Sequence, residues 1–227
     1  MAGALRPAAT LVALLLFAAT GARQPGRGAE GPPLSPAQTA LFATDHLAAI
    51  HESETLDYRF RHDGAKPWDD TVSLAIRAVH KDGSKDVAVA FLSGSRRVEL
   101  PSVARFHGNP LIMYFLEWDV RQMQQATGGS ALYFRTRLRN AFADAAETGT
   151  ATITLDGRPQ PATVVVLEPY KRDPEIARYP SFREKTYRFV LAKAVPGMIY
   201  EISTALPSDA EGAPAGGDRV RFVGMHQ

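Results

Sequence analysis

The chain contains no cysteine, and this absence excludes several kinds of chemistry. Without thiols there is no disulfide, iron–sulfur cluster, thiolate zinc site or cysteine nucleophile. No cysteine follows the apolar run near the N-terminus either, so lipid attachment at that point is excluded. The 227 residues are enough to bury a sizeable apolar core, and a domain of this length does not need disulfides for stability.

Motifs that would name a reaction or a cofactor are also missing. The sequence has no Gly-Lys-Ser/Thr for phosphate binding, and no Gly-x-Ser-x-Gly surrounds Ser93 or Ser95. The six histidines are scattered, and His46 and His51 are spaced to lie on different sides of a helix. A net charge of +2 is too weak to indicate nucleic-acid binding. We therefore predict no catalytic residue, no metal, no cofactor and no nucleic-acid partner.

The N-terminal segment has the three-part pattern of a secretory signal peptide. Arg6 precedes an apolar run at residues 8–19, and Thr20-Gly21-Ala22 supplies small residues that a signal peptidase reads. The run is short for a transmembrane helix, and an uncleaved membrane anchor is the alternative. Glycine and proline are frequent at residues 23–36, which predicts a flexible leader. We expect a signal peptide (1–22), the leader (23–36) and one domain (37–227), periplasmic or secreted, with no transmembrane segment after cleavage.

Alternation of apolar and polar residues predicts antiparallel strands in both halves of the domain. The first four strands follow one another through short turns, which is typical of a meander: Leu56–Arg61, Val72–Ala78, Val87–Phe91 and a strand containing Val98 and Leu100. The later strands are Thr150–Leu155, Thr163–Leu167, Tyr187–Leu191 and Met198–Ile202. The valine run in Thr163–Leu167 indicates a central strand, and Val220–Val223 indicates a last short strand at an edge.

Three helices are predicted around these strands. The first begins at Pro36 behind a capping Ser35 and carries one apolar stripe of Leu41, Phe42, His46, Leu47 and Ile50. The second begins at Asn109-Pro110 and ends at Gly128-Gly129. The third follows Ser130, and its core stripe is Phe134, Leu138, Ala141, Phe142 and Ala145. The fold class is therefore α+β: an antiparallel, curved sheet with an N-terminal helix and a helical pair inserted in mid-sheet. We expect Phe115, Leu116, Phe134 and Leu138 to be buried between helices and sheet.

Two groups of side chains on the helical pair are candidate ligand contacts. Tyr114, Trp118 and Tyr133 would line an apolar cavity between the helices and the sheet. Arg135 and Arg139 lie one turn apart and would hold an anionic group. The alternative is that the aromatic residues pack in the core and that the arginines pair with acidic residues of neighbouring strands.

Other polar residues and glycines allow weaker interpretations. Glu117 and Asp119 are two residues apart, so they point away from each other and favour a surface face of the helix. Residues 170–173, from Tyr170 to Asp173, together with His107 are the best candidates for an enzyme, on residue type alone. Glycines at both ends of the helical pair and in its middle (Gly108, Gly128, Gly129 and Gly149) are either hinges of a lid or helix stops.

The order of elements resembles that of the periplasmic lipoprotein carriers and their relatives, the LolA/LolB-like group. The resemblance is carried by residues 47–60, a helix leading into the first strand, and by residues 109–145, the inserted helices. It implies a half-barrel whose mouth the helices cover, and it carries over no functional residue. Residues 107–142 also resemble exported bacterial proteins of unassigned function. We predict an exported, non-catalytic binding or carrier module for an apolar or lipid-like ligand, and the alternatives are a protein-interaction or structural module with a protein partner, or an enzyme.

Overall fold

A single antiparallel sheet of nine strands organises the molecule, in the order β4-β3-β2-β1-β9-β8-β7-β6-β5. The computed structural model describes residues 33–207 and 216–227, so the predicted signal peptide and most of the leader lie outside the described residues. The strands are β1 (Thr55–Asp63), β2 (Trp68–Val79), β3 (Lys85–Phe91), β4 (Val103–Phe106), β5 (Glu147–Leu155), β6 (Arg158–Leu167), β7 (Thr186–Leu191), β8 (Ile199–Ala205) and β9 (Gly217–His226). The predicted α+β class with an antiparallel sheet is confirmed.

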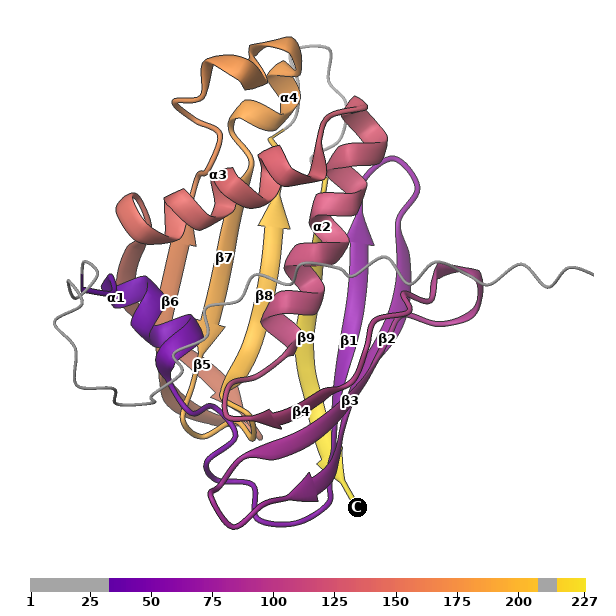
Figure 1. The fold of residues 1–227 in the computed structure, drawn as a ribbon, viewed down its shortest axis with the longest axis vertical. Coiled ribbons are helices and arrows are strands. Elements are labelled where there is room, and N and C mark those ends of the chain that lie inside the picture. The colour runs from indigo at the N-terminus through magenta and orange to yellow at the C-terminus, as the bar shows by residue number, and fades with distance from the viewer. Residues whose placement is uncertain (1–32, 208–215) are drawn as a thin grey trace, which may run out of the picture.

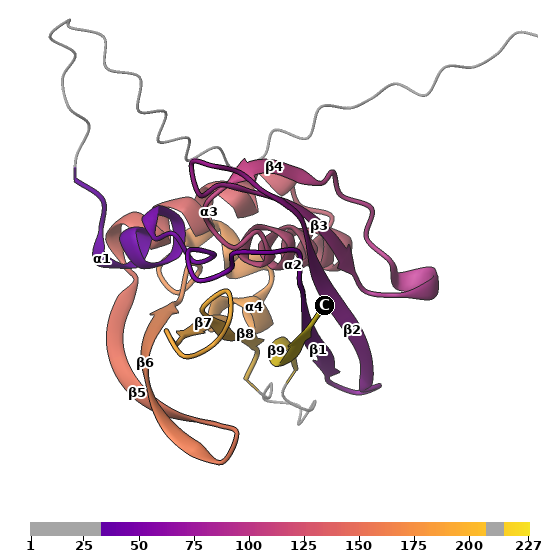
Figure 2. The same cartoon turned by 90° about the horizontal axis from the view of Figure 1, so that it is seen from below.

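The sheet is curved, and the long helices α2 and α3 lie on its concave side (Figures 1 and 2). The helices are α1 (Pro36–Gln38), α2 (Leu111–Thr127), α3 (Ala131–Asp144) and α4 (Pro180–Arg183), with short helical turns at Thr39–Ala43, Gly94–Arg96 and Pro174–Arg178. Figure 2 shows the strands curling around α2 and α3. Inward side chains of the sheet, such as Phe60 and Phe189, join Phe115 and Phe134 of the helices in one buried apolar cluster.

The helical pair connects the two edges of the sheet. Strand β4 forms one edge and precedes α2, while β5 forms the other edge and follows α3. A chain that leaves one edge and rejoins the sheet at the opposite edge must cross the face between them. This connectivity explains why α2 and α3 span the concave face (Figure 1).

Strand β9 occupies the centre of the sheet, so the predicted edge position for Val220–Val223 is wrong. It is also longer than predicted, and it pairs with both β1 and β8. Val220 is fully buried on the inner face while its neighbours Arg219 and Arg221 are exposed on the outer face. The prediction that Thr163–Leu167 forms a central strand is also wrong, because β6, which contains these residues, is second from an edge. The order of elements along the chain did not indicate that β9 lies between β1 and β8 and so joins the two halves of the sheet.

Two predictions in the first half of the chain, one helix and one strand, also need correction. Ser35 caps the helix that starts at Pro36 as expected, and Gln38 completes a reciprocal cap that was not predicted, but the helix ends at Ala43 instead of continuing to Ile50. His46 explains the break, because its Nε2 lies 2.7 Å from the carbonyl oxygen of Ala40 and its Nδ1 accepts from the backbone N–H of Asn109. The expected strand at Val98 and Leu100 is reduced to one bridge between Val98 and Phe91, and the fourth strand is β4 instead.

The ends of the helical pair follow the sequence closely. The Asn109 side chain accepts a hydrogen bond from the backbone N–H of Leu111 at 3.0 Å, although the helix begins one residue later than predicted. Gly128 ends α2 in the left-handed conformation, with φ +67°. The residues predicted to be buried, Phe115, Leu116, Phe134 and Leu138, are all buried. Ala145 is exposed, because α3 ends at Asp144 and leaves it outside the core stripe.

Candidate functional site: the helical pair on the concave face

Helix α2 rests on the sheet through an aromatic cluster. The Trp118 ring packs against Phe60 of β1, Trp68 of β2 and Phe91 of β3, with centroid separations of 5.8, 6.4 and 6.3 Å. Trp68 in turn stacks on Phe60 at 5.1 Å, and the guanidinium of Arg96 lies 4.4 Å from the Trp68 ring centre. Offset and edge-to-face contacts of this kind stabilise the packing beyond what the burial of the apolar rings contributes.

A polar tie beside this cluster fixes α2 to the sheet. The Trp118 indole N–H donates to Oδ2 of Asp218 at 2.8 Å, and His62 Nδ1 lies 2.7 Å from Oδ1 of the same carboxylate. The backbone N–H of Asp218 donates to the Thr204 hydroxyl. The hydrogen bond to Asp218 raises the pKa of His62, and the negative charges of Asp218 and Asp63 add to this effect. One carboxylate at the start of β9 thus holds α2, β1 and β9 together.

A second tie is an ion pair buried between α2 and β7. Lys185, immediately before β7, contacts the carboxylate of Asp119, and their side chains are only 5% and 1% exposed. The Tyr187 hydroxyl donates to the other Asp119 oxygen at 2.5 Å. Burial and the nearby Asp119 charge raise the pKa of Tyr187 well above its ordinary value. The expectation that Asp119 lies on a surface face of the helix is therefore wrong.

The start of α2 has its own anchor at the opposite end of the sheet. Asn109 donates from Nδ2 to the carbonyl oxygen of Gly197 at 2.8 Å, and its backbone N–H donates to His46. Asn109, whose exposed fraction is 3%, therefore makes its polar contacts with buried groups. Gly197 has φ +71°, and a Cβ there would lie 2.7 Å from Leu56 Cδ1. Only glycine allows this close approach.

The third helix is tied to the segment after β6. The Tyr133 hydroxyl donates to Asp173, and Arg137 Nε lies 2.7 Å from the same carboxylate. Burial raises the pKa of Tyr133 to about 12, and the bond to Asp173 adds to this. The Tyr179 hydroxyl donates to the carbonyl oxygen of Thr127, at the turn between α2 and α3. These bonds fasten the turn in the middle of the helical pair and the start of α3.

The five predicted ligand-contact residues are distributed among different neighbours. Tyr114 donates to the carbonyl oxygen of Pro101 at 2.5 Å, whereas Trp118 and Tyr133 are bonded to Asp218 and Asp173. Arg135 makes a bidentate pair with Glu117 of α2 at 3.0 and 2.7 Å, so its acidic partner lies on the neighbouring helix and not on a strand. Arg139 is exposed. The structure therefore brings Tyr114 and Trp118 together on one helix but does not gather all five around one point.

The polar ties themselves were missed by sequence reasoning. Asp119 and Lys185 are 66 residues apart, and Trp118 and Asp218 are 100 apart, so no local spacing signals either contact. A weak signal was present in α2, where the charged Glu117 and Asp119 interrupt an apolar stretch. The proposed enzyme group is not assembled around His107, which pairs with Asp45, while Tyr170 is buried beside Tyr187.

The described surface is hollowed in at least three places. One is on the outer face of β1 and β9, one lies between the end of α3 and the segment after β6, and one lies between β5 and the outer face of β7 and β8. Between the layers, side chains of the helices and the sheet form the continuous buried cluster described above.

The described residues, 33–207 and 216–227, contain no group of three or more metal-ligating side chains arranged to hold an ion. No helix among them is long and apolar enough to cross a membrane.

Comparison with known proteins found no matching family model and no matching curated protein. Among solved structures, the lipoprotein LppX of Mycobacterium tuberculosis is 10% identical, with a TM-score of 0.31, over 76% of this chain and 86% of that one. The LolA superfamily protein NE2245 of Nitrosomonas europaea is 8% identical, with a TM-score of 0.22, over 84% and 92%. One of the two is itself a LolA superfamily protein, the group that the order of elements resembles, but at these identities and TM-scores neither likeness carries an argument about this chain.

Proposed function

We propose that the protein is a non-catalytic binding or carrier module for an apolar or lipid-like ligand, which it holds between the helical pair and the concave face. Export to the periplasm or the medium is part of this proposal. A protein-interaction module is the alternative.

The observation that carries the proposal is how α2 is attached. Its first turn is anchored through Asn109, and its middle is held by Asp218 and Lys185. Asp218 lies at the start of β9 and Lys185 just before β7, at the same end of the antiparallel sheet. Between the anchor and these ties, α2 meets the sheet through buried apolar side chains such as Phe115 and Leu116. A helix that is anchored at its first turn and held at its middle by two polar contacts can open as a lid when those contacts break.

The turn between the two helices suits such a motion. Gly128 is in the left-handed region, and a Cβ placed there would meet nothing within 4 Å. Gly129 is crowded, because a Cβ would lie 3.1 Å from the Phe134 ring. Backbone freedom therefore resides at Gly128, which also serves as the helix stop.

The free energy lost when the Asp119–Lys185 pair is broken and the free energy gained by burying an apolar ligand are of comparable size. Leaving one charge of a buried ion pair without its partner costs roughly 3–5 kcal/mol, which is an upper bound for separating the pair, and apolar burial contributes about 25 cal/mol per Å². A ligand that buries roughly 200 Å² of apolar surface would offset that loss by about 5 kcal/mol. An alkyl chain of moderate length provides such an area, whereas a small polar metabolite does not.

The direct test is binding of an environment-sensitive apolar dye to the folded protein and its displacement by a fatty acid or phospholipid. Trp118→Ala and Gly128→Pro should weaken binding, because the first removes the aromatic contact and the second disturbs the turn. Leu132→Ala is the matched control, since Leu132 is 70% exposed on α3. If the folded wild-type protein binds neither dye nor lipid, the carrier proposal fails and the interaction module takes its place.

Two further measurements test the two parts of this proposal, the kind of partner and export. Native mass spectrometry of protein purified from its own host should show a co-purifying apolar molecule for a carrier, and a second chain for an interaction module. N-terminal sequencing of the mature protein should begin near Arg23 if the signal peptide is cleaved. An intact Met1 on cytoplasmic protein contradicts export.

A further inference from the structure

The outer face of the sheet carries two arginine pairs at its centre. In the register of β1 and β9, Arg59 lies opposite Arg221, and Arg61 lies opposite Arg219. Like charges directly opposite each other on one face of a sheet are destabilising. All four side chains are on exposed residues. Two consecutive arginine–arginine pairs on exposed neighbouring strands therefore need an explanation beyond the fold.

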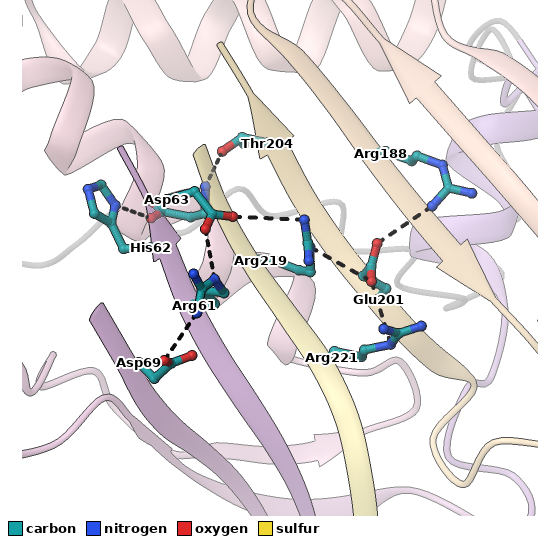
Figure 3. A network of polar contacts seen from close by, with 10 residues as sticks. Arg61, His62, Asp63, Asp69, Arg188, Glu201, Thr204, Arg219 and Arg221 are labelled. Carbon is teal, nitrogen blue, oxygen red and sulfur yellow. Dashed lines mark hydrogen bonds and ion pairs between the residues drawn. The ribbon is translucent and has the colours of Figure 1, made fainter. Parts of the chain in front are cut away.

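Nearby carboxylates neutralise this charge only in part (Figure 3). Arg61 is well paired, at 2.7 Å from Asp63 and 3.3 Å from Asp69. Glu201 of β8 is shared among three arginines at longer range: 3.6 Å from Arg188, 4.0 Å from Arg219 and 3.7 Å from Arg221.

Arg59 has no ion pair with any acidic residue in the part of the chain that the structure describes. The nearest acidic residue on its own outward row, Asp57, pairs with His226 at 2.7 Å. The positive charge is thus least compensated at Arg59 and at its cross-strand neighbour Arg221, which among residues 33–207 and 216–227 contacts no carboxylate but the shared Glu201.

The same arginines surround a hollow of about 460 Å³. Its charged lining consists of four arginines and one aspartate, and its apolar lining is Phe222 and Val223. The pairing of β1 with β9 shifts register beside Asp57 and Tyr58, and this irregularity leaves Val223 63% exposed at the hollow. Pockets of a few hundred Å³ are the usual size for small ligands.

We propose that this outer-face hollow binds a phosphate-bearing group, held by Arg59 and Arg221 with Arg61 and Arg219 at its side. Guanidinium groups bind phosphate oxygens through paired N–H donors, and several arginines around one group suit a charge greater than that of a single carboxylate. The apolar floor accommodates the carbon skeleton that carries the phosphate. The phosphate belongs either to a soluble compound or to a phospholipid head group at a membrane surface. The site lies on the opposite face of the sheet from the helical pair and does not depend on the carrier proposal.

Thermal unfolding at low ionic strength tests the site with inorganic phosphate as the probe. Phosphate should raise the Tm of the wild-type protein saturably, and sodium chloride at matched ionic strength should not. In the double variant Arg59→Thr with Arg221→Thr, the apparent phosphate affinity should fall at least tenfold. Threonine is favoured in strands, so the fold is preserved. The control is Arg77→Thr with Arg158→Thr, which removes the same charge from exposed arginines outside the hollow and should keep the wild-type response.

Vesicles identify the source of the phosphate. Sedimentation with phosphatidylglycerol vesicles but not with phosphatidylcholine vesicles, lost in the Arg59/Arg221 variant, supports an anionic head group. A saturable phosphate response without vesicle binding supports a soluble phosphate compound. If phosphate acts no more strongly than chloride, or if both double variants lose the response equally, the site is overturned. Dye binding at the concave face should be unchanged in the Arg59/Arg221 variant. Failure of the phosphate-site proposal can therefore be distinguished from failure of the carrier proposal.

Discussion

The buried pair between Asp119 and Lys185 gives the most quantitative prediction. The Asp119 carboxylate is 1% exposed, and in Lys185→Met it would keep, among the described residues, the Tyr187 hydroxyl alone as a partner. Leaving a buried charge without its counter-ion costs roughly 3–5 kcal/mol of unfolding free energy. Adding Asp119→Leu removes the uncompensated charge, so the double variant should recover most of that loss.

Urea unfolding of the wild type, both single variants and the double variant measures this coupling. The control is Lys171→Met, because the pair of Lys171 with Glu168 is exposed and should contribute less than about 1 kcal/mol. If α2 is tied down by this pair, hydrogen exchange in α2 should increase more in Lys185→Met than exchange in β1. A cost below about 1 kcal/mol, or an equal increase in both elements, would refute the description of this pair as a tie on α2.

Three other predictions follow from single residues. Leu116→Ala should lower the unfolding free energy by about 2–5 kcal/mol, because Leu116 is buried between α2 and the sheet, and a loss under about half a kcal/mol in urea unfolding would mean an exposed face. The pKa of His62 is raised in the folded state, so its pairing with Asp218 contributes stability below the ordinary histidine pKa of about 6.5 and loses it as the pH rises through the folded value. His62→Asn should therefore remove a decline in stability across neutral pH, and identical pH profiles of the two proteins would contradict this. Gly197→Ala should cost at least about 1–2 kcal/mol for the left-handed backbone alone, and the clash with Leu56 should add to it, whereas Gly224→Ala meets nothing within 4 Å and should cost less.

Local pattern was sufficient to predict most of the elements. Alternation placed β1, β2 and β3, and the caps at Ser35 and Gly128 placed helix ends, because each depends on residues within one or two turns. The helix after Pro36 failed for a tertiary reason: His46 bonds to Ala40 and to the distant Asn109. Local propensity does not register such contacts.

Long-range pairing set the limit for both the fold and the site. β9 looked like an edge strand because its partner β1 lies more than a hundred residues earlier in the chain. Asp119 was predicted to be exposed because its partner Lys185 is 66 residues away in the sequence, and local spacing gives no sign of the contact. The arginine pairs on the outer face have the same origin: each arginine is ordinary in its own strand, and only the register of β1 with β9 places them opposite each other.

The central claim is that α2 and α3 lift from the sheet to admit an apolar ligand. The absence of native cysteine allows spin labels at two introduced cysteines without background. One label belongs at Gln125, which is exposed near the end of α2, and the other at Lys81, which is exposed in the turn between β2 and β3. Double electron–electron resonance should show one distance distribution in the free protein and a second, shifted distribution when oleate is added. An unchanged distribution under conditions where oleate is bound would contradict the claim.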